Sequence, residues 1–220
     1  PALKKLYPAP TDLREACARH LEYFNTNPFM SSFALGVAAG MEEDRAGAPT
    51  QDRAACDGRI RQIKRALASS LAALGDAFFW GALRPAAAAW GGLAWLIAAS
   101  LGSAAAPLLG LGVYLAAFNG PALAARWKGL EAGYLHKEGV AAALEALRMP
   151  KRTRWVRRGG LAAAACLALA ALVVPPWGRP AGFGAAALLL AAFAARLFGF
   201  SALQIYCSAL ALGAAREVLL

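Results

Sequence analysis

The chain has 220 residues, of which 59% are hydrophobic and only 16% are charged, whereas soluble domains have about 45–50% apolar and about 25% charged residues. This composition argues against one soluble domain. The net charge of +10 does not indicate a nucleic-acid-binding protein, because no polar domain carries the excess. Four separated cysteines and two histidines predict neither a metal site, nor a cofactor, nor a disulfide framework.

Residues 1–65 predict amphipathic helices at the cytoplasmic face or at the membrane interface. Apolar residues recur there at helical spacing, and we expect the following to face the core: Leu13, Cys17, His20, Leu21 and Phe24. Charged residues between them, including Arg14 and Arg19, are expected to face water. Residues 25–28, N-T-N-P, predict a break, because proline disfavours a helical residue before it. The apolar run 31–41 is too short to cross a hydrocarbon core of about 30 Å.

Residues 66–82 form an apolar run of minimal length that contains Gly75 and Asp76. We interpret it as a re-entrant hairpin, because broken backbone at membrane depth is tolerated where protein or water surrounds it. An acid at such a place indicates function. The alternative is that Asp76 caps the second arm of the hairpin.

Residues 66–220 as a whole predict a membrane domain. No charge occurs in 86–125, which is long enough for two spans of about 20 residues with a turn at 100–103. A further span is expected from 159 to about 175, and 181–215 holds one or two more. The fold class is therefore an all-α integral membrane protein with about four to five spans.

Basic residues set the expected orientation. Lys151, Arg152, Arg154, Arg157 and Arg158 directly precede the apolar run at Gly159, and basic residues that flank spans stay cytoplasmic. We therefore expect a multi-pass protein with 1–65 and 126–158 on the cytoplasmic side of the membrane.

Several motifs, in conserved order along essentially the whole chain, resemble a known family. Residues 20–29, H-L-E-Y-F-N-T-N-P-F, closely resemble the signature H-L-E-[FY]-F-N-T-x-P-[FY] of the IID component of the mannose/fructose/sorbose phosphotransferase system. Residues 36–45, G-V-A-A-G-M-E-E-D-R, are similar to its G-V-x-x-x-[ML]-E-E-x-R motif. Weaker similarities cover 1–8, 63–85 and 133–139. Because the chain begins with Pro1, we interpret it as an N-terminally shortened member or a fragment.

The resemblance implies a multi-pass subunit of a bacterial plasma membrane that forms a sugar translocation unit with a IIC partner. IIA and IIB proteins or domains then pass a phosphoryl group to the incoming hexose-type sugar, within a larger oligomeric complex. No phosphorylated residue is expected in this chain, and its sequence contains no evident nucleophile–base pair.

One stretch departs from the family pattern. The family's G-P-L-A-G-x-G-D-P reads S-S-L-A-A-L-G-D-A at residues 69–77. Loss of the prolines and of two glycines favours continuous helix over a tight loop. A second function class therefore stays open: a diverged homologue without transport that has a regulatory or structural role in the membrane.

Five residues are candidates for sugar binding: Asn25, Asn27, Glu42, Glu43 and Asp76. Amides and carboxylates can hydrogen-bond sugar hydroxyls. The alternatives are a turn before Pro28 for the asparagines and a charged helix end for the two glutamates. Arg84 is expected to anchor the interface or to pair with Asp76, and Phe78, Phe79 and Trp80 to stack on a sugar or to lie in an interfacial belt.

Overall fold

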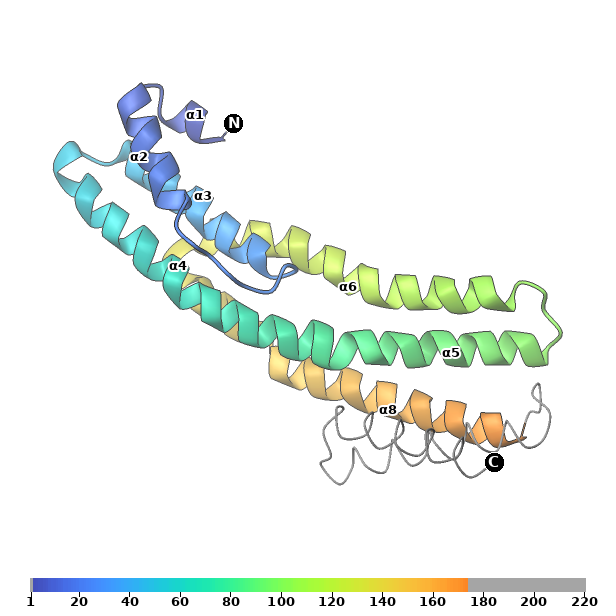
Figure 1. Cartoon of the computed structure of the whole chain (residues 1–220). Helices are drawn as coiled ribbons and strands as arrows, with labels where there is room; N and C mark the ends of the chain where they lie inside the picture. Colours follow the sequence, from blue (N-terminus) through green and yellow to red (C-terminus); the bar gives the residue numbers. More distant parts are fainter. Residues whose placement is uncertain (1, 174–220) are drawn as a thin grey trace, which may run out of the picture. The chain divides into compact units, whose positions relative to one another are not determined.

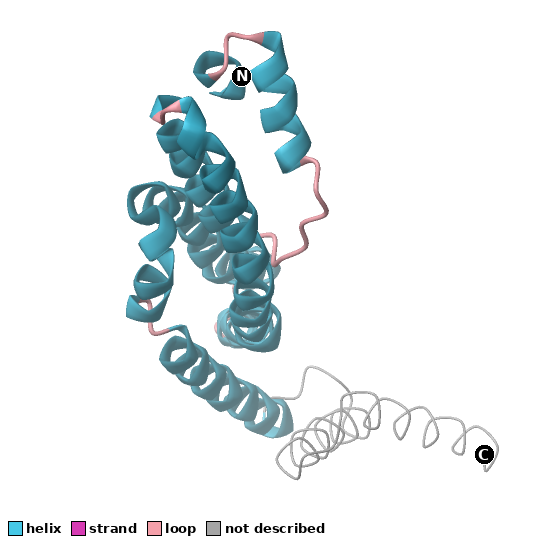
Figure 2. Cartoon of the chain, turned by 90° about the vertical axis from the view of Figure 1, so that its left-hand side faces the viewer, coloured by secondary structure: helices cyan, strands magenta, loops and turns pink. Residues whose placement is uncertain are grey.

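A computed structural model of the chain describes residues 2–173 and shows no strand among them (Figure 1). Most helices follow one another with short connections, and a longer loop over residues 21–30 joins α2 to α3 (Figure 2). The helices are α1 (Ala2–Leu6), α2 (Pro10–His20), α3 (Ser31–Gly47), η1 (Thr50–Asp52), α4 (Arg53–Gly75), η2 (Asp76–Leu83), α5 (Arg84–Ser100), α6 (Ala106–His136), η3 (Lys137–Gly139), α7 (Val140–Ala146) and α8 (Met149–Val173). The helical fold class predicted from the sequence is confirmed, and the segment 181–215 lies outside the described residues.

Two predicted interruptions occur where the sequence places them. The chain leaves the helical conformation after α2 and re-enters it at α3, so the N-T-N-P stretch lies in a loop. A second turn separates α5 from α6, and Gly102 adopts a φ of 74° there, a conformation that glycine reaches at little cost. The predicted turn at 100–103 is therefore confirmed.

The predicted re-entrant hairpin over 66–82 is wrong. Residues 66–75 complete α4, η2 follows as a π-helical segment, and α5 continues from Arg84 without a turn (Figure 1). Asp76 itself has helical dihedral angles and caps no helix with its side chain. The physical reason is the S-S-L-A-A-L-G-D-A sequence, which lacks the prolines that would break a helix.

The described chain divides into two compact units. The first comprises Pro1–Ala87 and Leu115–Arg157, and the second comprises Ala88–Tyr114 and Arg158–Leu220. The first unit therefore joins the N-terminal helices to the second half of α6, so this division does not follow the boundary expected at residue 65. The cytoplasmic or interfacial position of 1–65 stays a prediction.

A single apolar core holds the first unit together. α3 contributes Phe33, Val37 and Met41, and α4 contributes Ile60 and Leu71, all at most 6% exposed. Phe33, Val37 and Met41 are four residues apart, and Ile60 and Leu71 are eleven residues apart, about three helical turns. Each helix therefore turns one stripe toward the core. Full burial of each large side chain stabilises the fold by about 1.5–3 kcal/mol.

Glycines bring α3 and α6 into backbone contact within this unit. A Cβ on Gly36 would lie 2.2 Å from the carbonyl oxygen of Leu130, and one on Gly133 would lie 2.2 Å from that of Phe33. Small residues at such crossings let helices approach closely, as in membrane proteins.

The described part of the second unit exposes large apolar side chains. Leu101 is 80% exposed and Leu108 is 73% exposed, which suits contact with lipid and not with water. Two helical stretches, Thr50–Ser100 and Ala106–Ala170, each contain a segment long and apolar enough to cross a membrane. The total of four to five spans stays a prediction, because the last of them fall outside the described residues.

The glycine contact yields a first test. We expect Gly36→Ala to destabilise the fold by about 1–3 kcal/mol, because the new methyl group meets backbone atoms that cannot move aside. Gly58→Ala is the matched control, since nothing lies within 4 Å of a Cβ there, and alanine is the better helix former by about 1 kcal/mol. Thermal unfolding in detergent measures both, and equal midpoints would contradict the close contact.

Candidate functional site

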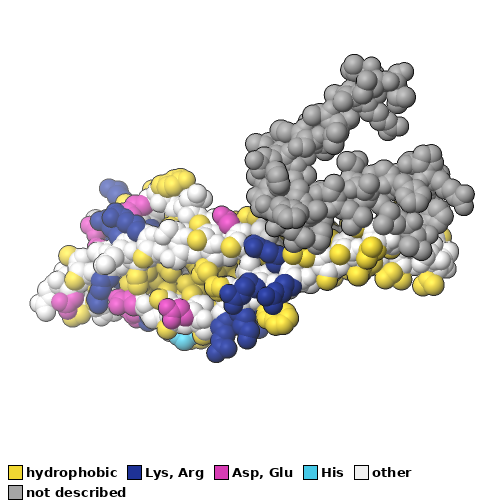
Figure 3. Space-filling model, turned by 90° about the horizontal axis from the view of Figure 1, so that it is seen from below, with side chains coloured by type: hydrophobic (Ala, Val, Ile, Leu, Met, Phe, Trp, Pro, Cys, Tyr) yellow, Lys and Arg dark blue, Asp and Glu magenta, His cyan; other side chains and the backbone are white. Residues whose placement is uncertain are grey.

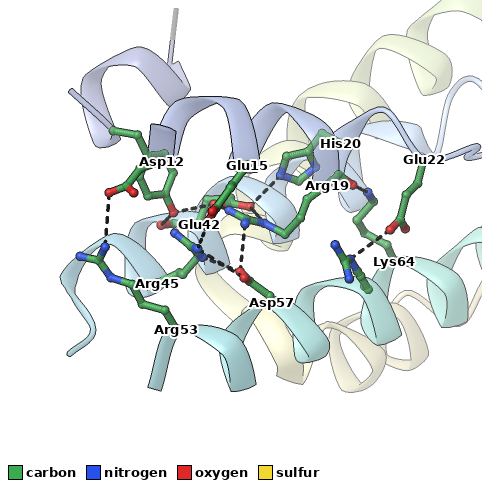
Figure 4. Close-up of polar contacts among 12 residues, drawn as sticks. Asp12, Glu15, Arg19, His20, Glu22, Glu42, Arg45, Arg53, Asp57 and Lys64 are labelled. Atoms are coloured by element: carbon green, nitrogen blue, oxygen red, sulfur yellow. Dashed lines mark hydrogen bonds and ion pairs between the residues drawn. The ribbon is translucent and has the colours of Figure 1, made fainter. Parts of the chain in front are cut away.

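Glu42 is the centre of a buried polar cluster in the first unit (Figure 4). Its side chain is 1% exposed. Oε1 accepts a hydrogen bond from Arg19 Nε at 3.0 Å, and Oε2 accepts one from Arg19 Nη2 at 2.9 Å. Tyr7 donates its hydroxyl proton to Oε2 at 2.6 Å, and His20 Nε2 lies 2.9 Å from Oε1. This bidentate arginine–carboxylate pair is among the strongest hydrogen-bonded contacts in proteins.

These contacts hold the Glu42 carboxyl in its charged form. Burial raises its pKa, but hydrogen bonds from His20, Arg19 and Tyr7 outweigh burial and lower the pKa from the ordinary 4.5 to about 2. The carboxylate is therefore ionised at neutral pH although it is buried.

Arg45 and Asp57 extend the Glu42 cluster to α4. Arg19 Nη1 lies 3.0 Å from Asp57 Oδ1, and Arg45 donates from Nε to the same oxygen. The guanidinium of Arg45 also lies 5.3 Å from the centre of the Tyr7 ring. The hydrogen bond to Asp57 raises the pKa of Arg45 above its ordinary value. Two arginines and two carboxylates thus join α2, α3 and α4 in one network, and Tyr7, the residue after α1, is bound to it through Glu42.

The predicted orientation of α2 is wrong in part. Arg19, expected to face water, is 2% exposed, whereas Cys17 is exposed and Leu21 is 84% exposed. The buried residues of α2 are Ala16 and Arg19. The helix is turned in this way because Glu42 and Asp57 supply partners for the Arg19 guanidinium. The spacing of apolar residues does not indicate such partners.

A second polar contact joins the loop before α3 to the start of η2. Asn27 is 2% exposed and donates from Nδ2 to Asp76 Oδ1 at 2.8 Å. Its own Oδ1 accepts the backbone N–H of Phe29 at 3.0 Å. A Cβ on Gly75 would lie 2.4 Å from Cβ of Asn27. Only glycine at position 75 therefore lets the loop that carries Asn27 lie this close to α4. Asn27 therefore both shapes the turn and reaches Asp76.

Aromatic rings pack around Phe29, two residues after Asn27. The centre of the Phe29 ring lies 4.7 Å from that of Phe79, 5.4 Å from that of Trp80 and 5.6 Å from that of Phe118. The Arg126 guanidinium lies 5.3 Å from the centre of the Phe29 ring. Such edge and tilted contacts stabilise packed aromatic groups.

The five predicted site residues do not form one site. Asn27 and Asp76 are brought together, and Glu42 lies in its own cluster. Glu43 is exposed and accepts a hydrogen bond from the Tyr134 hydroxyl, while Asn25 is exposed on the loop. Arg84 lies over the Trp80 ring, 5.8 Å from its centre, and the ion pairs among the described residues do not join it to Asp76.

Sequence reasoning missed Arg19, Arg45, Asp57 and Tyr7 as members of the Glu42 cluster. One signal was available: Arg45 continues the spacing of Phe33, Val37 and Met41, so it lies on the buried stripe of α3. The sequence contains no comparable signal for Asp57, whose partners come from α2 and α3.

A cavity of about 720 Å³ opens beside the Glu42 cluster. Most of the wall is apolar, from Ala2, Leu3, Phe24, Pro28, Ala34, Leu35, Ala38 and Ala39, and polar groups come from His20, Ser31, Ser32, Glu42, Lys64 and Arg126. Such a wall suits an apolar surface better than a sugar, because sugar hydroxyls need polar partners. Among the described residues no cluster of His, Cys, Asp and Glu is suited to hold a metal ion.

Fold and site together define a helical membrane protein whose N-terminal helices are joined by buried charges. A family model described as the PTS system mannose/fructose/sorbose family IID component matches residues 1–169. The chain therefore belongs to the IID components of the mannose/fructose/sorbose family of phosphotransferase systems.

Relatives and solved structures agree with this assignment. The mannose-specific EIID component of Escherichia coli K12 is 43% identical over 61% of this chain and 44% of its own length. The sorbose-specific EIID component of Klebsiella pneumoniae is 41% identical over 64% of this chain and 46% of its own. The fructose permease IID component of Bacillus subtilis is 36% identical over 70% and 51%. The chain thus spans about half the length of these curated relatives.

The fold is similar to that of a cryo-EM structure of the mannose transporter ManYZ in complex with microcin E492. The TM-score is 0.52, with 36% identity over 76% of this chain and 57% of that chain. A second structure, described as a membrane protein, has a TM-score of 0.59 and 34% identity over the same shares.

Removal of the Glu42 carboxylate provides a second test. We expect Glu42→Ala to destabilise the fold by about 3–5 kcal/mol, because buried Arg19 loses both hydrogen bonds to Glu42 and keeps only Asp57 as a carboxylate partner. Glu43→Ala is the matched control, and as an exposed residue it should lower stability by about 1 kcal/mol or less. Denaturant or thermal unfolding of the full chain in detergent compares the two, and equal losses would contradict the role of Glu42.

The lowered pKa of Glu42 predicts how stability depends on pH. Because the folded-state pKa is about 2 and the ordinary value is 4.5, the contribution of the carboxylate is complete above pH 4.5 and is lost as pH falls through about 2. We therefore expect the stability difference between the native chain and Glu42→Gln to be largest near pH 7 and to shrink at pH 3. Unfolding midpoints at the two pH values measure it, and a constant difference would disprove the charge assignment.

Proposed function

We propose that this chain serves as the IID-type subunit of a mannose-type sugar phosphotransferase system. In this proposal it forms the sugar translocation unit with a IIC partner, while IIA and IIB proteins or domains phosphorylate the sugar. The observation that carries the proposal is the family match over residues 1–169, and the similarity to the ManYZ transporter structure supports it. The Glu42 cluster fits a scaffold and not a phosphoryl carrier, because every member is engaged in an ion pair or hydrogen bond.

We further propose a multi-pass arrangement in a bacterial plasma membrane. Exposed leucines on α6, such as Leu108 at 73% and Leu123 at 64%, support contact with hydrocarbon. The basic residues before Gly159 support a cytoplasmic position for 126–158, and with it for 1–65.

In this proposal the IIC partner binds an exposed apolar surface of this chain. The cavity beside the Glu42 cluster has a mostly apolar wall, and Leu35 on that wall is 63% exposed. Tyr23 and Leu21 on the neighbouring loop are 91% and 84% exposed. An exposed apolar patch of this kind marks a protein or membrane contact, so we assign it to the IIC subunit.

We place the contribution of this chain to sugar binding at Asp76, Asn27 and Asn25. Asp76 is exposed in the isolated chain, and one of its oxygens remains available beside the hydrogen bond from Asn27. Carboxylates accept hydrogen bonds from hydroxyl groups, and Trp80, 40% exposed nearby, offers an aromatic face for a sugar ring. Glu42 has both oxygens engaged, so we assign it to the scaffold.

Sugar uptake coupled to phosphorylation by the reconstituted IIA, IIB, IIC and IID proteins tests the proposal. We expect uptake that depends on this chain. Absence of uptake with an intact IIC partner would overturn the transport assignment and favour the diverged regulatory or structural homologue.

Asp76→Asn refines the same assay. The substitution keeps an oxygen for the Asn27 hydrogen bond but removes the charge, so we expect uptake to fall by roughly 10–100-fold, the worth of a hydrogen bond to a charged group. Asp44→Asn is the matched control, because Asp44 is exposed and pairs with Lys137 away from the loop. Equal uptake by the two variants would exclude Asp76 from the sugar site.

A further inference from the structure

The start of α8 carries an unusual concentration of cations. Arg148, Lys151, Arg152, Arg154 and Arg157, which we call the basic segment, occupy ten residues of chain, and no acid occurs between Glu145 and Glu217. All five side chains are exposed. The ion pairs among the described residues use none of them. Figure 3 shows Lys and Arg side chains gathered together on the face that it presents.

Packing of α8 fixes which way these cations point. Met149 is 6% exposed and belongs to the apolar core, and Val156 packs against the same core. Thr153, between them, donates its hydroxyl proton to the carbonyl of Met149 at 2.9 Å. Because Met149, Thr153 and Val156 share one face of the helix, Lys151 and Arg154 lie on the opposite face.

The surroundings of the basic segment are those of a membrane interface. Trp155 is 63% exposed between Arg154 and Arg157, and tryptophan favours the headgroup level of a bilayer. The helix then continues through a charge-free run from Gly159, in which Leu161 is 38% and Leu169 is 57% exposed. α6 repeats this order in reverse: exposed Leu123 is followed by Arg126, Trp127 at 79% exposure and Lys128.

We propose that the basic segment binds the phosphate groups of anionic phospholipids. Arginine and lysine beside a span attract anionic headgroups, and guanidinium groups bind phosphate in a bidentate manner. An acidic protein surface would also meet the charge requirement. The exposed Trp155 and the apolar run one turn away favour lipid, because both require contact with the bilayer. The inference does not depend on which sugar the complex transports.

Native mass spectrometry of the full chain in neutral detergent tests the proposal. Phosphatidylglycerol is compared with phosphatidylcholine of the same acyl chains. We expect preferential retention of phosphatidylglycerol, weakened by added salt because salt screens exposed charges. Equal retention of the two lipids by the native chain would overturn the proposal.

Substitution identifies the residues involved. The triple variant Lys151→Gln, Arg152→Gln, Arg154→Gln should bind phosphatidylglycerol on the order of 100-fold more weakly, since each cation near an anionic surface contributes about a factor of 5–10. The matched control removes three exposed cations of the N-terminal helices, Lys4→Gln, Lys5→Gln and Arg14→Gln, and should retain the lipid. Equal losses in both triple variants would show an effect of net charge alone and overturn the assignment.

A charge-conserving variant separates the effect of lost charge from the effect of misfolding. Arg152→Lys with Arg154→Lys keeps both charges, so it should retain preference for phosphatidylglycerol, and circular dichroism checks that all variants are equally helical. Unchanged lipid retention in the helical triple variant would overturn the proposal. An acidic protein surface would then be the expected partner of the basic segment.

Discussion

The buried pair of Glu42 and Arg19 is the interaction on which the N-terminal half of the first unit depends. α2 buries little apolar surface, since its buried residues are Ala16 and Arg19. Hydrophobic burial therefore cannot by itself fix the position of α2. The Glu42 carboxylate fixes that position instead, because it is bonded to Arg19 and His20 of α2 and to Tyr7, the residue after α1, at once.

A buried ion pair of this kind specifies geometry more than it adds stability. The gain from the contact is largely offset by the removal of both charges from water, whereas the loss of one partner is severe. Here the network also includes Asp57 and Arg45, so two positive and two negative groups balance. Helices that slid along one another would leave at least one charge buried without a partner, and the register of α1 to α4 is thereby fixed.

Close backbone contact is the second constraint, and it acts at two places in the first unit. Gly36 and Gly133 let α3 and α6 touch, and Gly75 lets the loop at Asn27 lie against the end of α4. The second contact positions the Asn27–Asp76 pair next to Phe29, Phe79 and Trp80. A side chain larger than hydrogen at these glycines would separate elements whose polar groups then lose their partners.

The sequence by itself determined the membrane character, the helical class, the loop at 25–28, the turn at 100–103 and the resemblance to IID components. These features follow from local composition, from periodicity and from turn residues, each of which acts over a few residues. Only the tertiary structure decided that α2 turns Arg19 inward and that Asn27 meets Asp76 while Glu42 lies in a separate cluster. Such outcomes depend on partners far apart in the chain, such as Asp57 for Arg19, and a hydrophobic pattern does not record where a buried charge finds its counterion.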